Sequence, residues 1–175
     1  GIKIMNKTVT AVLAISALAV NVAGATSNNT VGGTDNTIST NSTSSEVWGF
    51  QNNIDANNAL VFGTNNSVTG ENGFAGGNNA KASGRNSFAF GAHAESLVEY
   101  TKAIGSQART SAYNTVAIGN GSYASGPSAL AIGTTTKSQS DNTIALGSSV
   151  TTALNNSIGI GSIVNVNGVS SVAIG

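Results

Sequence analysis

Large and small residues alternate at fixed places along most of the chain. A glycine recurs every fourteen residues from Gly49 to Gly175, and blocks of fourteen residues phased on it fill residues 36–175. Within a block, positions 11 to 14 read large, small, large, glycine, as in VAIG at 116–119 and LAIG at 130–133. Alternation with a period of two is typical of a strand. Each block therefore predicts a short strand that ends at its glycine.

A second alternation lies earlier in each block. Positions 3, 5 and 7 are mostly small, as in Ala80, Ala82 and Gly84, and this predicts a second strand. Pro127 is the only proline, so the strands can continue one hydrogen-bonded ladder. Fixed-length coils that stack their strands in register form a β-solenoid, and at about 4.8 Å per coil ten coils would span roughly 48 Å. We expect an all-β fold, a parallel β-solenoid of about ten 14-residue coils.

The narrowness of a 14-residue coil predicts which side chains fill it. Two walls of large side chains would collide, so we expect positions 11 and 13 to point inward against the small residues of positions 3, 5 and 7. The predicted coil core is Phe88, Phe90, Ile104, Val116, Ile118, Leu130, Ile132, Ile144, Leu146, Ile158, Ile160, Val172 and Ile174. The small residue at position 12, such as Ala117, would then face outward. Because such a coil hides little apolar area, we expect self-association through this small-residue wall.

The recurring glycines are predicted to be turns with positive φ, where a Cβ would crowd the chain. The predicted repeat turns are Gly91, Gly105, Gly119, Gly133, Gly147, Gly161 and Gly175.

Composition excludes several classes of function. Only 8% of the residues are charged and the formal net charge is zero, so nothing attracts nucleic acid electrostatically. The chain has no cysteine, which excludes disulfides and thiolate metal sites. We therefore expect no cofactor, no metal and no nucleic-acid partner.

The amino-terminal segment is typical of an exported protein. Lys7 precedes an apolar run at 9–20, and the sequence AGA at 23–25 fits a signal-peptidase site. We expect residues 1–25 to be an upstream extension with a secretory signal peptide, and residues 26–35 to be a flexible lead-in to the repeats at 36–175.

Outward positions 4 and 8 carry most of the charges. Their signs alternate from block to block, and two tyrosines join them. One interpretation is a set of solvated ion pairs, each worth roughly 0 to 1 kcal/mol. The other is a ligand-contact strip, which would comprise Lys81, Glu95, Arg109, Tyr113 and Tyr123.

The block at 92–105 is the irregular one. Val98 replaces the usual glycine, Lys102 occupies a predicted inward position, and His93 is the only histidine. We expect a local bulge or changed packing here. One imidazole without a second ligand of its kind makes a poor zinc site, and no G-x-S-x-G elbow occurs, so no catalytic residue is predicted. Trp48 is expected to close the amino-terminal end of the solenoid.

The segments AKASGRNSFAFG and SYASGPSALAIG resemble the YadA-like head repeats of trimeric autotransporter adhesins. The resemblance covers about 140 residues, from 36 to 175. It implies a left-handed parallel β-roll, a homotrimer and a non-enzymatic head on the surface of the outer membrane of a Gram-negative bacterium. The implied partners are host matrix proteins such as collagen, cell-surface receptors or other bacteria. Neck, stalk and membrane anchor would lie beyond residue 175.

Three alternatives remain at this point. The repeats could form a structural spacer that binds nothing. An ice-binding solenoid would need a flat threonine array, and Thr134–Thr136 with Thr151 and Thr152 make only a short one. A solenoid acyltransferase would use a hexapeptide period, which a 14-residue period does not match.

Overall fold

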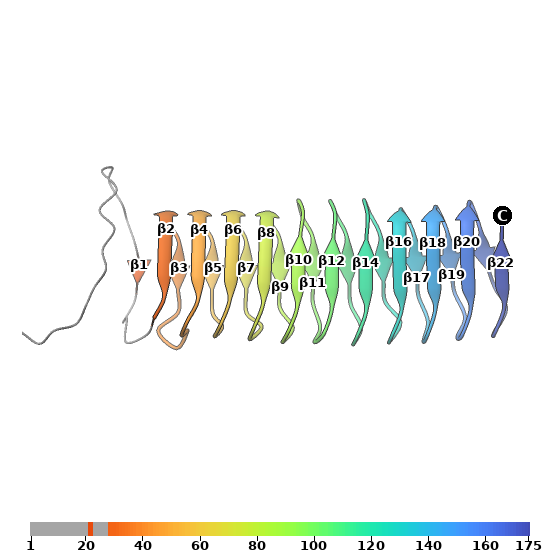
Figure 1. Ribbon diagram of the computed structural model, residues 1–175, viewed down its shortest axis with the longest axis horizontal. Helices are drawn as coiled ribbons and strands as arrows, with labels where there is room; N and C mark the ends of the chain where they lie inside the picture. The colour runs from red at the N-terminus through yellow and green to blue at the C-terminus, as the bar shows by residue number, and fades with distance from the viewer. Residues whose placement is uncertain (1–20, 23–27) are drawn as a thin grey trace, which may run out of the picture.

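The computed structural model describes residues 21–22 and 28–175, which form a rod of stacked coils. Figure 1 shows the strands side by side, each running across the long axis of the rod. No helix long and apolar enough to cross a membrane is found among the described residues.

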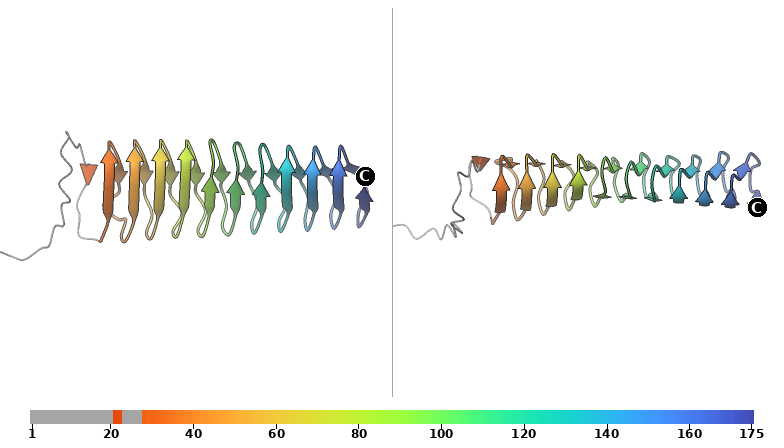
Figure 2. Two further views of the ribbon diagram at one scale, coloured as in Figure 1. Left: turned by 45° about the horizontal axis from the view of Figure 1, so that its top comes forward. Right: turned by 90° about the horizontal axis from the view of Figure 1, so that it is seen from above.

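The strands form two parallel sheets of eleven strands each. Figure 2 shows the coils from two further sides, with the two sheets along opposite walls. The short-strand sheet contains β1 (Asn21–Val22), β3 (Thr37–Ile38), β5 (Asn53–Ile54), β7 (Ser67–Val68), β9 (Lys81–Ala82), β11 (Glu95–Ser96), β13 (Arg109–Thr110), β15 (Tyr123–Ala124), β17 (Lys137–Ser138), β19 (Thr151–Thr152) and β21 (Asn165–Val166). The long-strand sheet contains β2 (Thr30–Thr34), β4 (Glu46–Phe50), β6 (Leu60–Thr64), β8 (Phe74–Asn78), β10 (Phe88–Phe90), β12 (Lys102–Ile104), β14 (Val116–Ile118), β16 (Leu130–Thr134), β18 (Ile144–Ser148), β20 (Ile158–Ser162) and β22 (Val172–Ile174).

The register follows the sequence period. From β4 onward each residue pairs with the residue fourteen positions later, as Val47 does with Val61 and Val116 with Leu130. Equivalent block positions therefore stack directly on one another along the rod. This confirms the predicted all-β, parallel β-solenoid of about ten 14-residue coils.

The first coil differs from the prediction. Gly33 pairs with Gly49 and Ile38 with Ile54, both sixteen residues apart, so two extra residues lie between β3 and β4. The first coil is therefore 34–49 rather than 36–49. Residues 30–34 were expected to be flexible and instead form β2, paired with β4. The predicted signal peptide lies outside the described residues, apart from the two residues of β1.

The interior of the coil holds the small residues, so the predicted coil core is wrong. Position 12 is fully buried at Ala75, Ala89, Ala103, Ala117, Ala131 and Ala145. The large residues flanking it point outward, and the exposed fraction reaches 51% at Phe90, 37% at Ile160, 64% at Val172 and 77% at Ile174. The other predicted core residues are only partly buried: Phe88, Ile104, Val116, Ile118, Leu130, Ile132, Ile144, Leu146 and Ile158.

The reason for this inversion is the space between the two sheets. Positions 3, 5, 10 and 12 already supply four inward side chains per coil, mostly small ones, and close packing leaves no room for further large ones. Alternation then sends positions 11 and 13 to the opposite face of the strand. Ala117 consequently lies inside the coil and cannot face a neighbouring chain.

Polar residues are also buried inside the coils, and most are hydrogen-bonded. Asn36, Asn52 and Asn66 stack in the amino-terminal coils, each almost fully buried. The side chain of Asn52 donates to the Gly63 carbonyl at 2.8 Å and accepts from the Asn66 backbone at 2.9 Å. This asparagine ladder satisfies backbone groups at the turns, as buried polar groups require.

The glycines that close the coils have a backbone that other residues rarely adopt. From Gly91 to Gly161 their φ angles lie between 120° and 135°. A Cβ on any of them would overlap the carbonyl group of the equivalent glycine in the next coil, and for Gly161 that partner is Gly175. The recurrence of glycine therefore has a backbone cause.

Coil 92–105 contains no bulge, contrary to expectation. Glu95 pairs with Lys81 and Arg109, and Lys102 pairs with Phe88 and Val116, all in the regular 14-residue register. Its Lys102 points outward, because position 11 faces away from the interior.

Trp48 does not close the amino-terminal end. It lies on the outer side of β4, 46% exposed, with β2 paired beyond it, and its indole occupies the space beside Gly32.

Candidate functional site

Four of the five residues predicted as a ligand-contact strip form one continuous column. Lys81, Glu95, Arg109 and Tyr123 occupy position 4 of successive coils and pair directly across β9, β11, β13 and β15. We call this column the polar strip. Because equivalent positions stack in a solenoid, neighbouring members of the polar strip lie on adjacent strands.

Specific contacts order the polar strip. The Arg109 Nε lies 3.1 Å from the Glu95 Oε2, and the Arg109 guanidinium lies 5.7 Å from the centre of the Tyr123 ring. The Tyr123 hydroxyl is 3.0 Å from the Ser111 hydroxyl. Both members of the ion pair are partly solvated, so the pair itself contributes little stability. The arrangement nevertheless holds a guanidinium and a phenol ring in a fixed position at the surface.

Tyr113, the fifth predicted residue, belongs to a separate group. It lies on the turn between β13 and β14, and its ring meets the edge of Tyr100, with centroids 5.5 Å apart. Arg85 donates to the Tyr100 hydroxyl at 3.2 Å and lies 3.5 Å from the Glu99 carboxylate. We call Arg85, Glu99, Tyr100 and Tyr113 the turn cluster. Its contacts show that Tyr113 does not join the polar strip directly.

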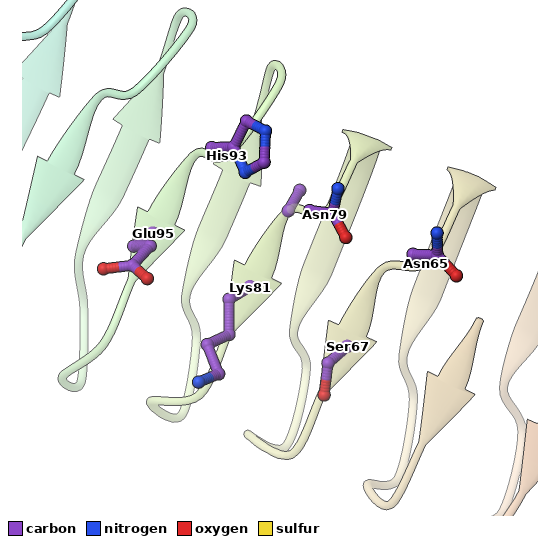
Figure 3. Close-up of a pocket in the computed structure, with 7 residues that line it drawn as sticks. Asn65, Ser67, Asn79, Lys81, His93 and Glu95 are labelled. Atoms are coloured by element: carbon purple, nitrogen blue, oxygen red, sulfur yellow. The ribbon is translucent and has the colours of Figure 1, made fainter. Parts of the chain in front are cut away.

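A shallow depression of about 350 Å³ adjoins the amino-terminal end of the polar strip. Figure 3 shows its polar side chains in two columns on successive coils. One column contains Ser67, Lys81 and Glu95 at position 4. The other contains Asn65, Asn79 and His93 at position 2 of their blocks. The sequence prediction included Lys81 and Glu95 but missed the turn column beside them.

His93 has a conformational role in this turn column. Its φ is 57°, and Asn65 and Asn79 have the same left-handed backbone with φ of 56°. Asparagine and histidine are among the residues that tolerate this region best. Asparagine at position 2 of two consecutive blocks, Asn65 and Asn79, was the signal in the sequence that could have identified this column. Among the described residues, no group of three potential metal-ligating side chains occurs around His93 or elsewhere.

The threonine patch does not form a flat outer array. Thr136 and Thr152 are fully buried inside the coils, whereas Thr134 and Thr135 are exposed. An ice-binding surface needs its threonines on one accessible face, so this arrangement disfavours that alternative.

An extended apolar surface lies on the outer side of the long-strand sheet. Positions 11 and 13 of successive coils form two parallel rows along it, and Figure 1 shows the strands that carry them as one continuous wall. We call these residues the outer apolar face: Trp48, Leu60, Phe62, Phe74, Phe88, Phe90, Ile104, Val116, Ile118, Leu130, Ile132, Ile144, Leu146, Ile158, Ile160, Val172 and Ile174.

Within the outer apolar face, aromatic residues gather toward the amino-terminal end. Phe74 and Phe88 stack with centroids 4.3 Å apart, and Phe62 and Phe90 flank them. Gly76 leaves room for these rings, since a Cβ there would lie 2.8 Å from Phe90. A soluble monomer rarely exposes such an extended apolar surface, and surfaces of this kind mark interaction sites.

Comparisons with known proteins agree with this architecture. Residues 55–80, 69–94, 103–122 and 124–149 match the family described as YadA head domain repeat (2 copies). A comparison with curated proteins finds no matching sequence. The family matches fall on the regular coils, where the glycine turns, the buried small residues and the outer apolar face all recur. YadA head domain repeats, the head repeats of trimeric autotransporter adhesins, are therefore detected within residues 55–149 of this chain.

Proposed function

We propose that this chain is the head of a bacterial surface adhesin, a non-enzymatic homotrimer that binds extracellular ligands through its polar surface. The observation that carries the proposal is the outer apolar face on a chain built from YadA head repeats. The family supplies the expectation of a trimer, and the apolar face supplies a surface for it.

The trimer interface is assigned to the outer apolar face rather than to a small-residue wall. Covering this face would bury side chains such as Phe90 and Ile174, which a single chain leaves mostly exposed. Each square ångström of apolar surface removed from water contributes about 25 cal/mol, so rows that run through ten coils offer a large driving force. Trimer formation also compensates for the small amount of apolar surface that each narrow coil hides.

Ligand binding is assigned to the polar strip and the turn cluster. The polar strip lies on the short-strand sheet, on the wall opposite the outer apolar face, and therefore stays accessible in the trimer. Tyrosine and arginine are enriched among the residues that dominate protein–protein binding energy. Arg109 and Tyr123 hold each other in place, which lowers the entropy cost of binding.

The ligands follow from the family alone. By family resemblance they include matrix proteins such as collagen, receptors on host cells and the surfaces of other bacteria. The same resemblance places the head outside the outer membrane of a Gram-negative cell. Anchoring would be performed by a segment beyond the repeats.

The assembly can be tested by light scattering on the purified chain. A trimer would have three times the 17.3 kDa mass of one chain. A monodisperse monomer at micromolar concentration would contradict the assigned interface.

Binding can be tested separately on surfaces coated with collagen and on cultured cell monolayers, with albumin-coated wells as the blank. The double variant Arg109→Ala, Tyr123→Ala should reduce retention about tenfold or more, as expected for a binding hot spot. Lys137→Ala is the matched control, since Lys137 occupies the same column beyond the strip. Trimeric protein that adheres to neither surface would favour the structural spacer instead.

A further inference from the structure

A periodic interface does not define its own alignment. The outer apolar face repeats every fourteen residues, so a neighbouring copy shifted by one coil would meet nearly the same rows of side chains. Such a shift is only about 4.8 Å along the rod. A residue that breaks the repeat would favour one alignment of a homotrimer over the shifted ones.

Lys102 breaks the repeat in the middle of the face. It occupies position 11 between Phe88 and Val116, where the other coils from β6 onward carry an apolar residue. Its side chain is exposed, and it forms no ion pair among the residues that the structure describes. The other charged member of the row, Glu46, lies near the amino-terminal end. Covering Lys102 with another copy would desolvate an ammonium group, which is costly unless it is compensated.

We propose that Lys102 sets the register of the trimer, an inference that rests on the trimer proposed above. With the three copies parallel and unshifted, all three Lys102 side chains lie at one level, and every other level from β6 onward stays apolar. A shift of one copy by one coil would place its ammonium against the Phe88 or Val116 level of its neighbours. A single polar residue specifies register in coiled coils by the same physics, at some cost in stability.

The absence of cysteine from the chain permits a direct test with introduced thiols. Ile132 and Leu146 occupy position 13 of adjacent coils and pair across β16 and β18. Differently tagged Ile132→Cys and Leu146→Cys chains are refolded together and oxidised. In-register copies give disulfides between identical positions, whereas a shift by one coil gives disulfides between positions 132 and 146. We expect only identical-position disulfides with Lys102 present, and mixed disulfides to rise about tenfold with Lys102→Ile.

Small-angle X-ray scattering on the cysteine-free chain provides a second measurement. Shifted copies lengthen the particle by about 5 Å per coil, so Lys102→Ile should increase its maximum dimension. Lys81→Ile removes the same charge from the opposite sheet and should change neither measurement. Unchanged disulfides and unchanged length in Lys102→Ile would overturn the role of Lys102. A monomeric native chain would instead overturn the trimer itself, and light scattering distinguishes the two failures.

Discussion

At the scale of single residues, the solenoid is stabilised by an interior that is small and partly polar. Serine and threonine hydroxyls inside the coils find partners, as in the 2.7 Å contact between Ser138 and Thr143. Two buried hydroxyls, those of Ser87 and Thr136, have no hydrogen-bond partner among the described residues. A buried polar group without a partner costs free energy, so these two positions are expected to be suboptimal.

Thr136→Val is predicted to raise the free energy of unfolding by about 1 kcal/mol, because it removes an unpaired hydroxyl at nearly constant volume. Valine already occupies the same block position at Val150 and Val164, where it is buried. Thermal unfolding followed by circular dichroism should show a midpoint higher by about 2 to 4 °C.

Thr143→Val is the matched control. The Thr143 hydroxyl donates to the Ser140 carbonyl at 2.6 Å, and its loss should lower stability by about 1 to 2 kcal/mol. If Thr136→Val and Thr143→Val changed the free energy of unfolding equally, hydrogen bonding of the hydroxyl would not explain the effect of either substitution.

Ile163→Asn is predicted to stabilise the chain by about 1 kcal/mol. Ile163 has a φ of 58° and is 77% exposed, so a β-branched side chain occupies a left-handed turn without gaining burial. The converse substitution Asn114→Ile, at an exposed turn with φ of 55°, should destabilise by a similar amount. Calorimetric midpoints that move in the same direction for both variants would contradict this explanation.

At the scale of strands and turns, side-chain volume is shared between the two walls of each coil. Gly159 replaces the usual alanine at position 12, and a Cβ there would lie 2.8 Å from Val150 and 3.0 Å from Val166. The larger valines on the short-strand sheet are therefore accommodated by a glycine on the long-strand sheet. A smaller residue at position 12 thus offsets the larger residues that it faces in this part of the rod.

Gly133→Ala is predicted to destabilise by about 3 kcal/mol or more. Gly133 has a φ of 129°, and a Cβ would overlap the Gly147 carbonyl, so the two coils would have to separate. Gly121→Ala is the control, since its φ is 63° and the nearest atom to a Cβ is 3.5 Å away. That variant should cost only about 1 kcal/mol. If coil stacking did not require the glycine, urea unfolding would show that both variants lose the same free energy of unfolding.

At the scale of the whole molecule, the rod has two chemically different walls. From β6 onward the outer apolar face is interrupted only at Lys102 and Gly76, whereas the polar strip and the turn cluster occupy only the middle coils. One wall is suited to assembly and the other to recognition.

Ile132→Asp is predicted to abolish self-association, because three carboxylates would be buried in an apolar interface without partners. The side chain is only partly buried in the single chain, so the coil itself should still form. Light scattering should report a monomer and circular dichroism an unchanged strand content. Lys137→Asp on the short-strand sheet should leave the mass unchanged, and a trimeric Ile132→Asp would contradict the assigned interface.

The candidate site could be predicted in part from the repeat. Stacking of equivalent positions placed Lys81, Glu95, Arg109 and Tyr123 in one column. Tyr113 was assigned to the same strip only because its block position also faces outward. Tyr100 was missed, because its left-handed turn and its contact with Arg85 depend on how adjacent coils align their turns.

The sequence by itself determined the period, the two strands of each coil, the parallel stacking and the glycine turns, because these depend on spacing and backbone conformation. It did not determine which side of each strand is inside. Period-two alternation shows that a strand has two different faces, but it does not show which face is buried. Hydrophobicity favoured the face that carries the large residues, and this choice was wrong. The signal that could have corrected this was the predominance of alanine at position 12, because a narrow interior favours small side chains. Only the tertiary structure showed that two sheets so close together admit mainly alanine, serine, threonine and valine, with Ile38, Ile54 and three asparagines in the amino-terminal coils, and that the large residues of positions 11 and 13 face outward.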